Sequence, residues 1–424
     1  MKLKGINEQV MKSVQGLQEE MIEVTRKLIS FPSTLGNEGG AQRYYADLLR
    51  EIGMKIDIWE PDIDALKKHP AFITSRDHFS NSPVVAAECP GVGEGRSLLL
   101  CGHMDVVPPG EKTWSVDPWQ GTLKDGKIFG RGACDMKGGL AANYIAIKAL
   151  QKKNIQLQGD VLAASTIDEE SGSTGALALL ERGYRADAGV IPEPTGLELN
   201  TASTGSIWFR IRVFGESAHA GMAYKGVNSI YKSIKIMEAL RELEESRRIR
   251  LMHPLYTQHP VPFCLNVNKI EGGEWPATVP AETVLEGRMG ISPEETIEEG
   301  RQELEERIAL SAKGDPWMSD HPPVIQYRNC RWNSGLVEET HPFTKTLQQQ
   351  ADSVLDRHAR ISGMGPCSDS GTLIRYGGIP TINFGPNSME IAHQTDEYVD
   401  IESLVKTAQV IALTLIHWCG VKEN

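Results

Sequence analysis

Short apolar runs that each end in polar residues restrict the fold of this chain more than any other feature of the sequence. The runs cover residues 98–101, 161–166 and 188–191, and a helix pattern at residues 139–153 separates the first two. Apolar strands that alternate with helices are typical of an α/β sheet covered by helices on both faces. Because ligands bind at the carboxyl ends of strands in such sheets, the polar residues after each run mark the expected functional site.

The length of the chain and a change of pattern near residue 205 predict two domains. The chain has 424 residues, more than a single domain usually contains. From residue 205 the pattern becomes strand, helix, strand, strand, helix, strand, which predicts a ferredoxin-like split βαβ unit. We therefore expect one domain at residues 1–204 and 331–424, interrupted by an inserted α+β domain at residues 205–330.

The composition argues against several classes of partner and location. The net charge is -12 and no long Lys/Arg block occurs, so we expect no nucleic-acid or membrane partner. No apolar segment follows the basic N-terminus, and the apolar stretch at residues 410–416 is too short to span a bilayer. The seven cysteines are scattered without a CxxC pair, which predicts free thiols and a cytoplasmic location.

Five stretches carry residue types that bind hard metal ions. They are GHMD with His103 and Asp105, RGACDMKGG with Asp135, DEESG with Glu169 and Glu170, PEPT with Glu193, and AHQTDE with His393. Each stretch alone is typical of an ordinary cap, turn or helix-dipole contact. Together, two histidines and several carboxylates form a mixed nitrogen and oxygen set that suits zinc, cobalt or manganese. Spacing alone leaves open whether these side chains meet.

The same stretches, in the same order, make the chain resemble a known enzyme family. It is similar to the two-zinc amidohydrolases that include acetylornithine deacetylase, succinyl-diaminopimelate desuccinylase, aminoacylase and carboxypeptidase G. The matching segments are LLLCGHMDVVP, WSVDPWQGTLKDGKIFGRGACDMKGGLAA, IDEESGSTGA, PEPT, GESAHAG and AHQTDEYV. The resemblance implies an α/β fold with a mixed-sheet, zinc-peptidase-like catalytic domain and an inserted lid or dimerisation domain. It also implies a homodimer and two divalent ions, zinc or alternatively cobalt.

The resemblance implies a metal-binding role for five residues. His103 and Glu193 would bind one metal ion, and Glu170 and His393 would bind the other. Asp135 would bridge the two ions, which in such sites can share one water molecule and lower its pKa.

Two further residues would act on this water or orient a ligand, as the resemblance implies. Glu169 would take a proton from the water as the resulting hydroxide attacks an amide carbonyl, and would then pass it to the leaving amine. Asp105 would accept the second ring N–H of His103 and so select its tautomer.

Four residues outside the ligand set are candidates for substrate contacts. In relatives, the histidine that matches His219 stabilises the oxyanion, often from the partner subunit, and the arginine that matches Arg288 clamps a substrate carboxylate. The loop with Ser368 and Asp369 resembles the family loop that faces the substrate. Judged by the residues alone, His219 could instead be a polar loop residue and Arg288 part of a surface ion pair. Ser368 or Asp369 could be an ordinary helix cap.

Two positions bear on the substrate. Deacylases usually have Glu where Glu193 stands, whereas peptidase-like relatives have Asp. Many relatives have Asn where this chain has Ala277 or Thr278, which weakens any transfer of specificity. We expect cleavage of an N-acyl amino acid or amine, as in acetylornithine deacetylase. The alternatives are a succinyl-diaminopimelate desuccinylase, a formylaminopyrimidine deformylase, a dipeptidase or carboxypeptidase and, from another class, a non-catalytic binding protein.

Overall fold

The chain forms two compact units. The computed structural model describes residues 2–422, apart from the side chains of residues 2 and 328–330. The larger unit comprises Met1–Ala202, Leu336–Met364 and Ser368–Asn424, and the smaller unit comprises Ser203–Gly335 and Gly365–Cys367.

The larger unit is built on a mixed sheet, which confirms the expected α/β class. The strand order is β1-β2-β6-β3-β7-β17-β8-β15, and β16 pairs with β8. Strand β3 pairs in parallel with β6 and β7, and β17 pairs in parallel with β7, whereas β1 and β2 are antiparallel to their neighbours. The strands are β1 (Lys55–Trp59), β2 (Val84–Cys89), β3 (Leu98–His103), β6 (Val161–Thr166), β7 (Ala188–Ile191), β8 (Leu199–Ser203), β15 (Gly335–Leu336), β16 (Ile361–Met364) and β17 (Thr381–Asn383).

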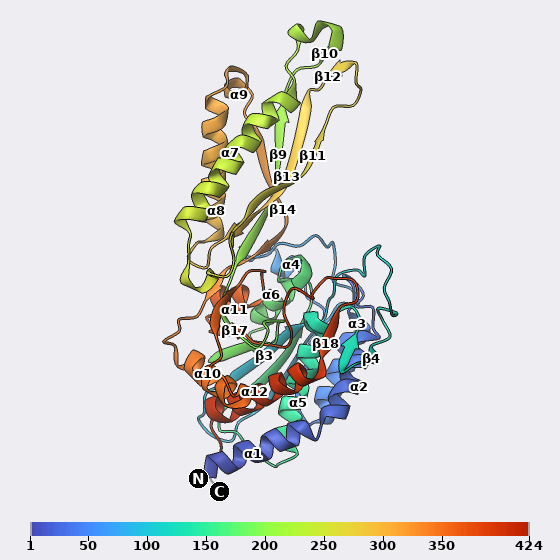
Figure 1. Ribbon diagram of the computed structural model, residues 1–424, viewed down its shortest axis with the longest axis vertical. Helices are drawn as coiled ribbons and strands as arrows, with labels where there is room; N and C mark the ends of the chain where they lie inside the picture. The colour runs from blue at the N-terminus through green and yellow to red at the C-terminus, as the bar shows by residue number, and fades with distance from the viewer. Residues whose placement is uncertain (1, 423–424) are drawn as a thin grey trace. The chain divides into compact units, whose positions relative to one another are not determined.

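Helices cover both faces of this sheet, which explains the continuous apolar runs (Figure 1). Leu98 and Leu100 pack into the core of one face, and Leu99 and Cys101 pack into the core of the other. The first face is covered by α1 (Lys2–Gln15), α2 (Gln18–Ile29), α3 (Gly39–Glu51), α5 (Gly138–Gln151), α10 (Pro342–Leu355) and α12 (Ile401–Cys419). The other is covered by α4 (Ile63–Leu66), α6 (Thr174–Glu181) and α11 (Ser370–Gly377). Among the described residues, no helix has both the length and the apolar character needed to cross a bilayer.

A small antiparallel sheet brings two distant loops together. Its strands are β4 (Thr122–Lys124), β5 (Lys127–Phe129) and β18 (Tyr398–Asp400). Because Tyr398 pairs with Phe129, the segment before β18 lies beside the segment after β5. These two segments contain His393 and Asp135.

The smaller unit has the strand and helix order that the sequence pattern predicts. Its antiparallel sheet has the order β11-β13-β9-β14, the arrangement of a ferredoxin-like unit. Helices α7 and α8 pack on this sheet, and a two-stranded ribbon of β10 and β12 extends from the unit (Figure 1). The elements are β9 (Gly205–Phe214), β10 (Ala218–His219), α7 (Ser229–Arg250), β11 (Leu265–Gly272), β12 (Thr278–Val279), β13 (Glu282–Ile291), α8 (Ile297–Lys313), α9 (Pro316–Asp320) and β14 (Val324–Trp332).

Candidate metal centre

Three neighbouring strands of the larger unit end at one place. His103 is the last residue of β3, the segment with Glu169 and Glu170 follows β6, and Glu193 follows β7. Since β3 pairs in parallel with both β6 and β7, their carboxyl ends lie at the same edge of the sheet. The apolar strands therefore hold these side chains within reach of one another.

Loops supply the other two residues of the predicted ligand set. Asp135 lies in a short helical turn, η1 (Ala133–Lys137), that leads directly into α5, and the peptide bond between Asp135 and Met136 is cis. His393 lies before β18 with a φ of 62°. The pairing of β18 with β5 holds the His393 segment next to the Asp135 segment.

The structure brings all five predicted ligands together in two groups of three, and Asp135 belongs to both groups. The Nε2 atom of His103 lies 3.0 Å from Asp135 Oδ1 and 3.7 Å from Glu193 Oε1. The Nε2 atom of His393 lies 3.0 Å from Glu170 Oε1 and 3.3 Å from Asp135 Oδ2. Each carboxylate oxygen of Asp135 thus faces a different histidine.

This donor set fits divalent cations. Ligand atoms about 2.0–2.2 Å from a tetrahedral zinc ion lie roughly 3.3–3.6 Å from each other. The distances from each histidine nitrogen to its two carboxylate oxygens are close to this range. Ligand atoms of His103, Asp135 and Glu170 all lie within 4.8 Å of one another. Several buried carboxylates at such short range repel one another unless cations compensate them, and nitrogen with oxygen donors suits borderline and hard ions.

The charges of the cluster shift the pKa values of its members. Burial raises the pKa of Glu193 well above its ordinary value, and the negative charge of Asp135 raises it further. Burial lowers the pKa of His103, but the hydrogen bond with Asp135 and the charges of Glu193 and Glu169 outweigh it and raise the pKa. Hydrogen bonds with Asp135 and Glu170 likewise overcome partial burial and raise the pKa of His393 to about 10. All three groups thus lie among negative charges that bound cations would balance.

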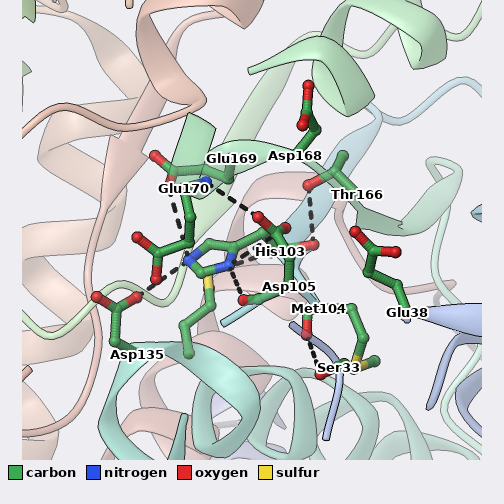
Figure 2. A network of polar contacts seen from close by, with 12 residues as sticks. Ser33, Glu38, His103, Met104, Asp105, Asp135, Thr166, Asp168, Glu169 and Glu170 are labelled. Carbon is green, nitrogen blue, oxygen red and sulfur yellow. Dashed lines mark hydrogen bonds and ion pairs between the residues drawn. The ribbon is translucent and has the colours of Figure 1, made fainter. Parts of the chain in front are cut away.

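Glu169 lies next to this cluster in a buried position. Its Oε2 atom is 4.0 Å from His103 Nε2. Burial raises the pKa of Glu169 well above its ordinary value, and nearby Glu193 and Asp369 raise it further against the opposing charge of His103. A carboxylate with a raised pKa can both accept and return a proton. The side chain of the neighbouring Asp168 points away from His103 (Figure 2). It accepts hydrogen bonds from Thr74 and Ser171.

Asp105 differs from the expectation in which atom meets His103. The Nδ1 atom of His103 lies 2.9 Å from the main-chain carbonyl oxygen of Asp105, whereas the nearest carboxylate oxygen of Asp105 is 3.7 Å away (Figure 2). The carboxylate instead accepts a hydrogen bond of 3.0 Å from the main-chain N–H of Glu170. Asp105 therefore contacts one ligand through its carbonyl and the backbone of another through its side chain.

His219 and Arg288 belong to the smaller unit. His219 ends β10, is exposed, and accepts a hydrogen bond of 3.1 Å from the N–H of Gly221 at its Nδ1 atom. Arg288 lies on β13 and donates to Ser206 Oγ at 2.8 Å, and its other nitrogens contact the sulfur atoms of Cys264 and Cys367. None of the described ion pairs involves Arg288, so its charge has no carboxylate partner there.

Ser368 and Asp369 are buried in the larger unit. Ser368 donates to Asn383 Oδ1 at 2.9 Å, and Asp369 Oδ2 accepts from Thr166 Oγ1 at 2.8 Å. Both side chains are thus hydrogen-bonded to residues at the ends of β17 and β6, which favours a supporting role over the expected contact with a substrate.

Two buried charged residues behind the centre were not among the candidates predicted from the sequence. Arg131 and Glu397 form an ion pair, and Glu397 accepts hydrogen bonds from the main-chain N–H groups of Cys134 and Asp135. Both residues lie inside motifs that the sequence analysis singled out, RGACDMKGG and AHQTDE. Their opposite charges were the available signal, but nothing in the sequence pairs them.

The chain is similar to several known proteins along most of its length. Residues 99–417 match Peptidase family M20/M25/M40. The chain is 30% identical to an N-formyl-4-amino-5-aminomethyl-2-methylpyrimidine deformylase from Halalkalibacterium halodurans, over 99% of both chains. It is 29% identical to the protein of the same name from Bacillus subtilis, over 97% of this chain and 98% of the other. A solved dinuclear metal-binding peptidase of the M20 family from Bacillus subtilis has the same fold, with a TM-score of 0.66, 16% identity and coverage of 95% and 99%.

Proposed function

The chain belongs to peptidase family M20/M25/M40 and is a metal-dependent hydrolase, and on this premise we propose that it removes the formyl group from an N-formyl aminopyrimidine. The observation that supports this substrate is the match to two deformylases along nearly the whole of each chain. Formylaminopyrimidine cleavage is one of the alternatives that the sequence analysis left open, and it replaces the acetylornithine deacetylase-like reaction as the first candidate.

The residues that would hold two divalent cations are the five described above, with zinc as the proposed metal and cobalt as the alternative. His103 and Glu193 would hold one ion, Glu170 and His393 the other, and Asp135 would contact both. When bound, such cations lower the pKa of a water molecule and polarise the carbonyl of the amide.

Glu169 is the proposed proton carrier of the reaction. Its buried carboxylate would take one proton from the attacking water and deliver it to the amine nitrogen as the carbon–nitrogen bond breaks. The products would be formate and the free aminomethylpyrimidine. The raised pKa of Glu169 supports this role, because a glutamate of ordinary pKa is a weak base that takes up and holds a proton from water poorly.

A substrate panel tests the proposal. We expect kcat/KM for the N-formyl aminopyrimidine to exceed that for its N-acetyl counterpart by roughly 10-fold or more, the discrimination that one methyl group in a closed pocket can supply. Released formate and free amine are the quantities to measure, with metal-stripped protein as the control. A preference for N-acetyl or N-succinyl compounds would contradict the formyl assignment and leave the hydrolase class intact.

One observation favours an N-acyl amino acid as a second candidate substrate. Arg288 is half-buried, and the described residues give it only hydroxyl and thiol partners. A substrate carboxylate would supply the missing counter-charge through a bidentate contact. Cleavage of an N-acetyl amino acid but not of the matching carboxamide would support this candidate over the aminopyrimidine.

We also infer that the protein forms a homodimer through its smaller unit. Strand β11 is an edge strand of the described sheet, and unpaired edges are covered or used for pairing in natural proteins. Tyr231 and Ile234 on α7 and Ile270 on β11 are exposed apolar residues of two elements that contact each other. A second copy of the same surface would cover both the edge and these side chains.

A further inference from the structure

A buried arginine and a buried glutamate lie behind the bridging residue, and neither is a member of the ligand set. Arg131 is 2% exposed and Glu397 is 0% exposed, and their closest atoms, Nη1 and Oε2, are 2.5 Å apart. Burying such a pair costs desolvation free energy that its own attraction often fails to recover. The role of the pair therefore lies in its contacts with the metal centre rather than in its contribution to stability.

Glu397 holds the backbone from which Asp135 projects. Its Oε1 atom accepts hydrogen bonds of 2.9 Å from the N–H of Cys134 and 3.2 Å from the N–H of Asp135. The carboxylate thus uses one oxygen for the turn that carries the bridging residue and the other for Arg131. Hydrogen bonds to a charged acceptor are among the stronger ones in proteins.

Arg131 reaches the segment that carries His393. Its Nη2 atom lies 3.5 Å from the main-chain oxygen of His393 and 3.4 Å from that of Pro109. His393 has a φ of 62°, a region that residues with side chains rarely occupy without support. The main-chain oxygen of Glu397 also accepts from the N–H of Gly130 at 2.9 Å. The pair therefore connects the two loops that carry Asp135 and His393.

The other ligands are held by different means. His103 ends β3 and Glu193 follows β7, two strands that pair directly, and Glu170 is held through its main-chain N–H by Asp105. Asp135 and His393, in contrast, lie on loops that Arg131 and Glu397 connect in addition to the pairing of β18 with β5. Displacing these loops would change the Asp135–His393 separation more than the separation of His103 and Glu193.

We propose that Arg131 and Glu397 are positioning residues that set the distance between Asp135 and His393. They thereby raise the cation affinity of the site of Glu170 and His393 more than that of the site of His103 and Glu193. The proposal rests on the metal centre of the proposed function. It differs from a purely structural ion pair, which would affect folding without distinguishing the two cation sites.

Metal titration of three variants tests the proposal. Arg131→Lys keeps the charge but loses the planar fork that reaches both loops, and Glu397→Gln keeps an acceptor oxygen but loses the charge. Arg247→Lys is the matched control, because Arg247 in the smaller unit is 1% exposed and pairs with Glu295 and Glu303. Metal-free protein is titrated with Co²⁺ while visible absorption is recorded, and thermal unfolding of the metal-free form is measured in parallel.

We expect wild type and Arg247→Lys each to bind two equivalents of Co²⁺, and the affinities of the variant to match those of wild type. In Arg131→Lys and Glu397→Gln, the affinity for one equivalent should fall by about 10- to 100-fold, the usual effect of removing a hydrogen-bond partner of a ligand, while that for the other changes far less. Unchanged binding in both variants, or an equal loss at both sites that follows the loss of thermal stability, would overturn the inference. Failure of wild type to bind two equivalents would overturn the metal centre and this inference with it, which separates the two results.

Discussion

Three consecutive carboxylates show how differently neighbouring residues are used. Asp168 accepts hydrogen bonds from Thr74 and Ser171, Glu169 is buried beside His103, and Glu170 faces His393. The sequence letters DEE are compatible with any assignment among the three. The positive φ of Asp168 turns the chain at this point and separates the directions of the side chains.

Replacement of Glu169 separates proton transfer from metal binding. Glu169→Gln keeps the shape and removes the proton acceptor, so we expect kcat to fall by about 10²–10⁴-fold. Metal content, measured by mass spectrometry, should stay at the wild-type level. Asp168→Asn is the control, since Asp168 points away from the cluster. A Glu169→Gln variant with more than about a tenth of wild-type kcat would remove Glu169 from the proposed role.

The ligand residues could be predicted from the sequence because each lies in a short motif with a recognisable chemical character. The supporting residues could not, because their roles depend on contacts between distant segments. Arg131 and Glu397 are separated by 266 positions, and Thr166 and Asp369 by 203. Likewise, the contact of His103 with a carbonyl rather than a carboxylate depends on local backbone geometry that residue types do not reveal.

At the scale of elements, periodicity predicted the central strands of the larger unit and the order of elements in the smaller one. The apolar runs became β3, β6 and β7 because helices cover both sheet faces, and the 205–330 pattern gave the expected strand and helix order. The inclusion of Gly365–Cys367 in the smaller unit was not predictable. Thr204 donates to the carbonyl oxygen of Gly365 at 2.7 Å, a tertiary contact without a sequence signature.

We expect Asp315 to make the stability of the smaller unit depend on pH. It accepts hydrogen bonds from Lys232 and Lys235 of α7 and caps α9 through the N–H groups of Trp317 and Met318. Burial raises the pKa of Asp315, but the hydrogen bonds from the two lysines outweigh it and hold the pKa below its ordinary value. The stabilisation is therefore present above the pKa of an unfolded aspartate and is lost as the pH falls towards the lower folded pKa.

We expect Asp315→Asn to lower the free energy of unfolding of the smaller unit by about 1–3 kcal/mol at pH 7. The difference from wild type should shrink below about pH 4, where the wild-type carboxyl begins to be protonated in the unfolded chain. Urea unfolding at pH 7 and pH 3.5 measures it. Asp320→Asn, an exposed position on the same helix, should change little. An Asp315 effect independent of pH would assign the stabilisation to shape rather than charge.

At the scale of the whole molecule, the proposed dimer surface consists of the β11 edge and the exposed apolar residues of α7. Ile234→Asp places a charge on this surface, and burying an unpaired charge in an interface is strongly unfavourable. We expect the variant to be a monomer in size-exclusion chromatography with light scattering. Leu310→Asp is the control, because Leu310 is exposed on α8 and lies outside the proposed surface. Monomeric wild type, or a variant that still dimerises, would contradict this surface.

The proposed role of His219 can be tested in mixed dimers, because the predicted contribution comes from the partner subunit. Glu169→Gln and His219→Ala homodimers should each have low activity. In a mixed dimer, the subunit with an intact Glu169 receives an intact His219 from its partner, so one of the two sites is complete. Unfolding and refolding an equal mixture should restore roughly a quarter of wild-type activity, since about half of the dimers are mixed and each has one complete site. If His219 acted within its own subunit, no mixed dimer would contain a complete site and the mixture would stay as inactive as its components.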